Sequence, residues 1–384
     1  MHRRTLLQVF AGVAVTGVPA FALQPSRRNR IVIAGGGILG ANIAYRLAKR
    51  GASVTLLERA KPATGATANS FAWVNAKKQP FDYFTLNRLG IDAWRQLDRE
   101  LSGQLPIVWG GSVEWTADAQ RAARMNETVR RFEQWGYPIQ AIDETALRAL
   151  EHHIVPGPVV AADYAECEAH IDPVAVTEVV LANAVKQGAR VEYPAEVTGL
   201  DLQNGQLRAV HTSKGDVEAD VLVIACGVDT PKVAALAGLR VPLTRSPGIL
   251  VHTAPGPRLV DRVVMSPIGN IKQKPDGRIV TGLDFGPAKT EDTTRAYGEQ
   301  FLEKMRAVLP RLSEATVEKV TLGLRPMPAD GHPVIGFPAG RRDIYITVMH
   351  SGVTLSPLVG RLAAAEILDG IEVEPLAPYR LERF

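Results

Sequence analysis

The sequence predicts an α/β fold in which one parallel sheet is assembled from segments that lie far apart in the chain. Residues 30–34, RIVIA, are a short apolar run rich in β-branched residues, which suits a buried parallel strand. Residues 221–227, VLVIACG, have the same character, again end in glycine and come much later. The 384 residues also exceed what one compact core usually holds. We therefore expect two domains, with an insertion between these strands.

The residues after the first strand have the pattern of a dinucleotide-binding turn. Gly35, Gly37 and Gly40 form G-x-G-x-x-G, which allows a tight turn, close approach to a pyrophosphate and close helix packing. The helix that follows presents free N–H groups and a partial positive charge to phosphates. Glu58 ends the next strand about 20 residues later, where a carboxylate accepts from ribose hydroxyls and repels a 2′-phosphate. This order of elements predicts a Rossmann-like domain.

The loop after Glu58 bears on which dinucleotide is bound. Residues 62–70, PATGATANS, are small and polar, where a nicotinamide-binding domain would normally continue its sheet. Such a loop suggests backbone and hydroxyl groups that wrap a second long phosphate ligand, and a plain surface loop is the alternative. The loop therefore favours a flavin dinucleotide.

A second unit follows the insertion. Residues 171–193, IDPVAVTEVVLANAVKQGARVEY, predict an amphipathic helix and a short strand. Asn204-Gly205 predicts a hairpin between the two strands that come next. The helix residues expected to face inward are Val174, Val179, Leu181, Ala182 and Val185.

The chain resembles the glycine/D-amino-acid oxidase (DAO) superfamily of FAD-dependent oxidoreductases from Arg30 to about Gly370. The motifs are the glycine turn with Glu58, GATANS, IDPVAV, ADVLVIACG, GLRPMPADGHPVIG and HSGVTLSPLVGRLAAAEIL. The resemblance implies an extended FAD whose pyrophosphate lies at the turn. It also implies a discontinuous FAD-binding domain and an α+β substrate domain with a mainly antiparallel sheet. The FAD-binding segments are 30–93, 168–238 and 321–384, and the substrate segments are 94–167 and 239–320.

The cofactor-binding residues that the resemblance implies fall in these motifs. They are Gly35, Gly37, Ile38, Gly40, Glu58, Arg59, Thr67, Asn69, Ser70, Val197, Cys226, Gly227, Gly352, Val353, Thr354 and Leu355. Independently of the resemblance, residues 345–368 predict a strand, a Gly/Ser/Thr turn and a helix. Backbone N–H groups at 352–355 are then candidates to donate to the pyrimidine edge of a flavin, and an ordinary βα turn is the alternative.

Arg325 and His350 are the candidate catalytic residues. Proline at 326 holds Arg325 in extended backbone, and a guanidinium group suits a carboxylate. The resemblance implies that Arg325 binds the substrate carboxylate, and a structural salt bridge is the alternative. His350 is the first residue of the HSGVTLSP turn. It is a candidate hydrogen-bond donor to the substrate or general base, and a histidine whose hydrogen bonds are satisfied within the turn is the alternative. His332, Lys272 and Lys289 are further polar candidates.

We expect oxidation of the C–N bond of an amino acid or N-substituted amino acid, by hydride transfer to flavin N5. Oxygen, a quinone or an electron-carrier protein would then accept the electrons. A 2-hydroxy-acid dehydrogenase and a flavin-binding module without turnover are alternatives, and an NAD-dependent dehydrogenase is a more distant one.

Composition excludes several other classes. The net charge is only +4, and the chain has no long basic run interleaved with aromatic residues. These features argue against a nucleic-acid-binding protein. Cys167 and Cys226 have no metal-binding spacing, so no metal site is expected. Relatives that link FAD covalently use a cysteine near the position of Gly323, which predicts noncovalent FAD here.

The first 22 residues predict an export signal. Arg3 and Arg4 precede an apolar run that is short for a membrane span, and Ala20-Phe21-Ala22 is a cleavage pattern. The arginine pair resembles a twin-arginine signal, which implies folding before export to the periplasm. An ordinary secretory signal or an uncleaved anchor is the alternative. After cleavage we expect no stable membrane span.

Overall fold

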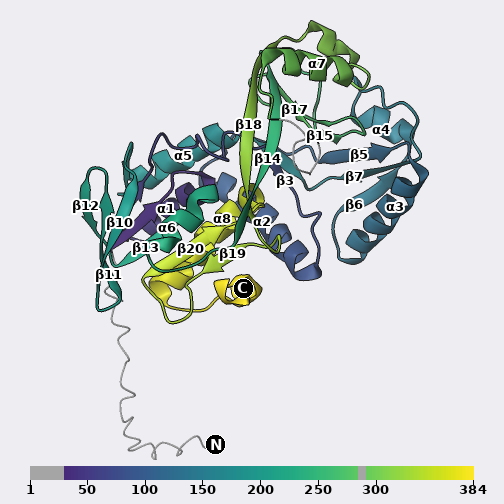
Figure 1. Cartoon of the computed structure of the whole chain (residues 1–384). Coiled ribbons are helices and arrows are strands. Elements are labelled where there is room, and N and C mark those ends of the chain that lie inside the picture. Colours follow the sequence, from purple (N-terminus) through teal and green to yellow (C-terminus); the bar gives the residue numbers. More distant parts are fainter. Residues whose placement is uncertain (1–29, 284–290) are drawn as a thin grey trace, which may run out of the picture.

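The computed structural model describes residues 30–283 and 291–384 and has two lobes (Figure 1). The predicted export signal and Lys289 lie outside these residues. Among the described residues, no helix has the length and apolar character that a membrane span requires.

The first lobe is built on a six-stranded sheet. In spatial order its strands are β19 (Val334–Gly336), β20 (Ile344–Val348), β13 (Val221–Ile224), β1 (Arg30–Ala34), β2 (Ser53–Leu57) and β9 (Arg190–Glu192). All neighbours are parallel except β19 and β20. Ile33 pairs with Val223 on one side and with Leu56 on the other. The two strands predicted from their apolar runs are therefore adjacent, and the interrupted parallel sheet is confirmed.

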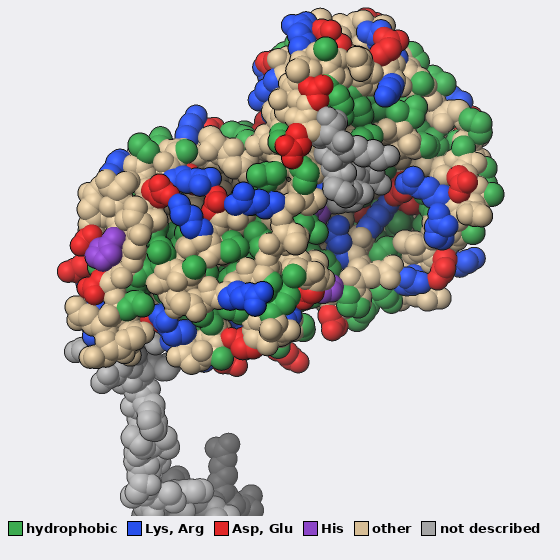
Figure 2. Space-filling view, in the orientation of Figure 1, with side chains coloured by type: hydrophobic (Ala, Val, Ile, Leu, Met, Phe, Trp, Pro, Cys, Tyr) green, Lys and Arg blue, Asp and Glu red, His purple; other side chains and the backbone are tan. Residues whose placement is uncertain are grey.

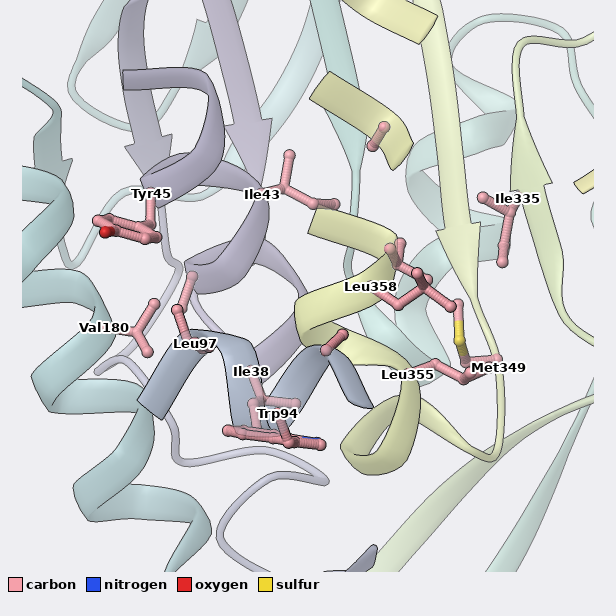
Figure 3. Packing of buried hydrophobic residues seen from close by; sticks show 14 of the residues in the cluster. Ile38, Ile43, Tyr45, Trp94, Leu97, Val180, Ile335, Met349, Leu355 and Leu358 are labelled. Atoms are coloured by element: carbon pink, nitrogen blue, oxygen red, sulfur yellow. The ribbon is translucent and has the colours of Figure 1, made fainter. Parts of the chain in front are cut away.

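Helices cover this sheet. They are α1 (Ile38–Lys49), α2 (Phe81–Glu100), α5 (Pro173–Lys186), α6 (Thr230–Ala235) and α8 (Gly352–Asp369). Helix α1 packs between α5 and α8, and Ile43, Val180 and Leu358 belong to one hydrophobic cluster (Figure 3). A Cβ atom at Gly360 would lie 2.8 Å from the carbonyl oxygen of Asn42, so a glycine lets α8 approach α1 this closely.

The inward face of α5 differs from the prediction. Val176, Val180, Leu181 and Ala184 are buried, whereas Ala182 and Val185 are exposed and Val174 and Val179 are half-buried. Of the predicted inward residues, Leu181 is buried and Val179 packs partly buried against the core, whereas Ala182 and Val185 were wrong. Apolar residues lie on every side of this helix, so its sequence pattern does not define a single buried face. The face that carries residues 176, 180 and 184 is buried because α5 packs against α1.

The second lobe contains an eight-stranded sheet. Its order is β18 (Val317–Pro328), β14 (Leu243–Thr253), β17 (Ile279–Gly282), β16 (Asn270–Gln273), β15 (Val263–Met265), β5 (Ser112–Thr116), β7 (Ala161–Ala165) and β6 (Ile139–Ile142). Only the β15–β5 pair is parallel. Helices α3 (Ala119–Gln134), α4 (Glu144–Leu150) and α7 (Arg295–Met305) complete this lobe. The predicted mainly antiparallel sheet is confirmed.

Two small sheets complete the fold. Strands β10 (Val197–Gln203), β11 (Gln206–Thr212) and β12 (Gly215–Glu218) form a meander whose first turn has positive φ at Asn204 and Gly205. Strands β3 (Trp73–Val74), β8 (Ala169–Ile171) and β4 (Ile107–Val108) form the other sheet. The expected segment ends at 93/94 and 320/321 fall inside α2 and β18, both of which continue without a break.

Candidate functional site

A cavity of about 430 Å³ runs from the carboxyl ends of β1 and β2 to the paired strands β14 and β18. Figure 2 shows the surface hollowed between the two lobes. The cavity is lined by most of the predicted cofactor residues and by both predicted catalytic residues. These are Gly35, Gly37, Ile38, Glu58, Arg59, Thr67, Asn69, Ser70, Val197, Cys226, Gly227, Gly352, Val353, Thr354, Arg325 and His350. Gly40 and Leu355 lie outside the lining.

The glycines of the first turn have different physical roles. Gly35 has φ +112°, and a Cβ atom there would lie 2.3 Å from the carbonyl oxygen of Ala225. A Cβ atom at Gly40 would lie 2.0 Å from the carbonyl oxygen of Gly35. These two glycines therefore allow the chain to pack on itself. Gly37 lines the cavity just before helix α1, and the amino terminus of a helix is a favoured place for a phosphate group.

The loop 62–70 folds back onto this turn. Thr67 is buried, and its hydroxyl oxygen accepts a hydrogen bond of 3.1 Å from the backbone N–H of Ile38. Glu58 accepts from the backbone N–H of Gly36 at 2.8 Å. The loop is therefore part of the cavity wall rather than a plain surface loop.

The Glu58 end of the cavity also contains Arg59, Val197, Cys226 and Gly227. Arg59 forms an ion pair of 2.9 Å with Asp229. The thiol of Cys226 donates to the carbonyl oxygen of Ala34 at 3.2 Å, and burial raises its pKa to about 12. Cys226 is therefore a protonated, unreactive thiol.

Helix α8 begins at the opposite end of the cavity. Gly352, Val353 and Thr354 of its first turn line the wall. The N–H of Leu355 donates to the carbonyl oxygen of Ser351 at 3.0 Å within the helix, and its side chain is fully buried. The structure thus corrects the predicted set of N–H donors, because Leu355 is the first residue bonded inside the helix.

Arg325 reaches the cavity from β18. Its strand pairs with β14, where Arg325 is opposite Ser246, and its Nη1 lies 3.4 Å from the Ser246 hydroxyl. A Cβ atom at Gly248 would lie 2.5 Å from Arg325 Nη2. The absence of a side chain at 248 therefore gives the guanidinium group its path along the sheet.

His350 lies at the same end of the cavity as Arg325 and Lys78. Burial, together with the positive charges of Lys78 and Arg325, lowers the pKa of His350 to about 3. The imidazole is therefore neutral near pH 7. A neutral ring suits a hydrogen-bonding role better than the role of a general base, whose pKa should lie near the working pH.

The sequence did not single out several lining residues. Trp73, Asn75, Lys78, Gly248 and Asn270 all line the cavity. Asn75 donates through its backbone N–H to the hydroxyl of Thr354 at 3.3 Å, and its own side-chain oxygen is buried without a partner. Trp73, Asn75 and Lys78 follow the PATGATANS loop closely and Asn270 begins a strand, whereas Gly248 lies in the middle of β14 and has no such signal.

Two other polar candidates lie outside the lining. Lys272 is buried, its Nζ donates to the carbonyl oxygen of Ile171 at 2.8 Å, and burial lowers its pKa to about 7. The His332 ring packs edge-on against Tyr83, with centroids 5.2 Å apart.

The residues fit an extended FAD. The N–H groups of Gly35, Gly36 and Ile38 donate within the protein, so the pyrophosphate is expected beside Gly37 and the amino terminus of α1, with Glu58 beyond it for a ribose. The first turn of α8 supplies a second set of N–H groups at the far end, where Arg325 and His350 lie. The isoalloxazine ring belongs at that end, since the nucleotide belongs beside Glu58. No group of three or more metal-ligating side chains occurs in the described ranges.

Comparisons with curated proteins agree with this fit. A family model described as FAD dependent oxidoreductase matches residues 30–366. The chain is 25% identical over 367 residues to a glycine oxidase of Bacillus licheniformis, covering 93% of this chain and 98% of that protein. It is also 25% identical over 402 residues to the mitochondrial dimethylglycine dehydrogenase of Mus musculus, covering 93% and 45%.

Solved structures show the same fold. A glycine oxidase from Geobacillus kaustophilus superposes with a TM-score of 0.84 at 23% identity, covering 93% of this chain and 99% of that one. An L-proline dehydrogenase from P. horikoshii also has a TM-score of 0.84 at 23% identity, covering 93% and 98%. With the family model spanning most of the chain, this protein belongs to the family of FAD-dependent oxidoreductases.

Proposed function

We propose that this enzyme oxidises the C–N bond of an amino acid or N-substituted amino acid, such as a D-amino acid, glycine or sarcosine. The observation that carries the proposal is that Arg325 lines the cavity together with His350 and the first turn of α8. Guanidinium binds carboxylate through two parallel hydrogen bonds. The relatives named glycine oxidase and dimethylglycine dehydrogenase support the substrate class.

The residues of the cavity have separate roles in this reaction. Bound FAD supplies the acceptor for the two electrons that leave the substrate. Arg325 holds the carboxylate and thereby orients the α C–H bond, and orientation supplies much of the rate. The neutral ring of His350 offers a hydrogen bond to the amino group. Phe71, Trp73 and Leu250 line the cavity and exclude water around the reacting bond. The imine product is then hydrolysed by water.

The test is anaerobic reduction of the purified holoenzyme, followed by loss of the yellow flavin absorbance. D-amino acids, glycine, sarcosine and 2-hydroxy acids are added separately. Bleaching by amines supports the proposal. Bleaching by hydroxy acids alone would identify a C–OH dehydrogenase, and no bleaching by any compound would favour a module without turnover.

Variants test the role of Arg325. Arg325→Ala should weaken binding of the carboxylate substrate by about 100-fold, since a charge-assisted pair is lost. Arg325→Lys should restore only part of the binding, because an ammonium group cannot form the two parallel bonds. A matched control is Arg295→Ala, because Arg295 pairs with Glu299 on the exposed face of α7. An unchanged KM in Arg325→Ala would contradict the role.

We also propose that FAD is held noncovalently in the two-domain arrangement given above. The raised pKa of Cys226 supports this, because a protonated thiol is a poor nucleophile. Precipitation with acid should release all flavin into the supernatant. Flavin that stays with the precipitated chain would contradict noncovalent binding.

We further propose export to the periplasm through the segment 1–22, with a quinone or an electron carrier as acceptor. The basic start and the Ala20-Phe21-Ala22 pattern support export. Mass spectrometry of the native protein should find a chain that begins at Leu23. Replacing Arg3 and Arg4 by Lys should retain the protein in the cytoplasm, and an intact amino terminus in the periplasm would contradict cleavage.

A further inference from the structure

The hydroxyl of Ser351 lies at the α8 end of the cavity and contacts a buried tyrosine. Ser351 immediately precedes α8 and lines the cavity, and its side chain makes no capping hydrogen bond to the helix. Its Oγ lies 2.5 Å from the phenol oxygen of Tyr83 in α2. The hydroxyl pair therefore connects α2 to the wall where the flavin ring belongs.

Tyr83 is held firmly in this position. Its side chain is buried, and its ring packs edge-on against His332 and lies 6.1 Å from the ring of Tyr379. Gly90, two turns further along α2, allows the close approach of the helices, since a Cβ atom there would lie 2.7 Å from the carbonyl oxygen of Thr354. The phenol is thus fixed by packing on both its ring and its helix.

The chemistry of the two hydroxyls sets the direction of the hydrogen bond. Burial raises the pKa of Tyr83, so the phenol keeps its proton. A phenol is a stronger acid than an aliphatic alcohol, so donation from Tyr83 to Ser351 is the favoured arrangement. The proton of Ser351 is then available to an acceptor in the cavity, and successive hydrogen bonds strengthen one another.

We propose that Tyr83 is a positioning residue that directs the Ser351 hydroxyl, as a donor, toward the electron-rich pyrimidine edge of FAD. Negative charge grows at that edge when the flavin is reduced. This chain of hydrogen bonds, from Tyr83 through Ser351 to the flavin, stabilises the reduced flavin and therefore raises the flavin reduction potential. This inference depends on FAD binding and is independent of the substrate.

The test measures the flavin reduction potential of the holoenzyme against a reference dye, with dithionite as reductant and no substrate. Tyr83→Phe keeps the ring and removes the hydroxyl. At a fixed potential, the ratio of reduced to oxidised flavin should fall about tenfold, which is about 30 mV for a two-electron couple. Ser351→Ala should shift the ratio in the same direction, and the double variant should shift it no further than Ser351→Ala alone.

Tyr379→Phe is the matched control, because it removes a phenol hydroxyl from the same aromatic cluster without touching Ser351. Its potential should equal that of the wild type. An unchanged potential in Tyr83→Phe, or an equal shift in Tyr379→Phe, would overturn the proposal. If Tyr83→Phe does not retain flavin, the reduction potential of Ser351→Ala becomes the test. An unchanged potential in Ser351→Ala would also overturn the proposal. Dithionite needs no enzyme turnover, so failure of the amine assay leaves this result interpretable.

Discussion

The indole of Trp73 donates to the carboxylate of Glu168 at 2.6 Å, directly behind the cavity wall. Glu168 is fully buried, and its second oxygen accepts from the phenol of Tyr137 at 2.6 Å. Burial raises the pKa of Glu168, and the positive charge of Lys77, which pairs with Asp163 at 2.7 Å, opposes that shift. The buried Glu168 side chain therefore fixes the position of Trp73 in the cavity wall.

Glu168→Ala should lower the free energy of unfolding by about 3 kcal/mol, because Trp73 and Tyr137 lose their shared acceptor. It should also lower kcat/KM about tenfold as the wall at Trp73 loosens. Urea titration and steady-state kinetics measure the two effects. Glu299→Ala is the control, since its pair with Arg295 is exposed on α7, and neither quantity should change. A fully stable Glu168→Ala enzyme would contradict the positioning role.

Gly40→Ala should abolish FAD retention or folding. The added Cβ atom would lie 2.0 Å from the carbonyl oxygen of Gly35, so the glycine turn must move. The flavin-to-protein absorbance ratio after purification measures this loss. Gly256→Ala should retain full flavin, because nothing lies within 4 Å of a Cβ atom there. Normal flavin content in Gly40→Ala would show that the turn tolerates displacement.

Gly248→Ala should impair substrate binding while leaving the fold intact. The new methyl group would meet Arg325 Nη2 at 2.5 Å, and the flexible guanidinium group would move before the backbone does. We expect KM for a carboxylate substrate to rise at least about tenfold, with a similar flavin content. Ser246→Ala should have a smaller effect, because it removes one long hydrogen bond to the same group. An unchanged KM in Gly248→Ala would contradict the role of Arg325 in binding the substrate carboxylate.

The pH dependence of His350 has a defined sign. Its folded-state pKa of about 3 lies below the ordinary value of 6.5, so the folded protein holds a neutral ring. The unfolded chain takes up a proton as pH falls below 6.5, and stability is lost progressively between pH 6.5 and 3. His350→Gln should flatten this part of the stability curve. Between pH 7 and 9 the kcat/KM profile of the variant should be lower than, and parallel to, that of the wild type.

The sequence alone determined the cofactor half of this protein. The glycine turn, Glu58 and the strand–turn–helix at 345–368 depend on backbone geometry within short segments, so local patterns predict them. The strands β1, β2 and β13 were predicted for the same reason, since a buried parallel strand is apolar along its whole length.

Only the tertiary structure decided which further side chains join Arg325 and His350 in the cavity wall. Trp73 lines the same cavity because β3 converges on β18 and the start of α8, and no local pattern encodes the packing of segments that far apart. The same reason explains α5, whose inward face is chosen by α1 rather than by its own apolar residues. It also explains the links from Tyr83 to Ser351 and from Glu168 to Trp73, which exist only where distant elements pack together.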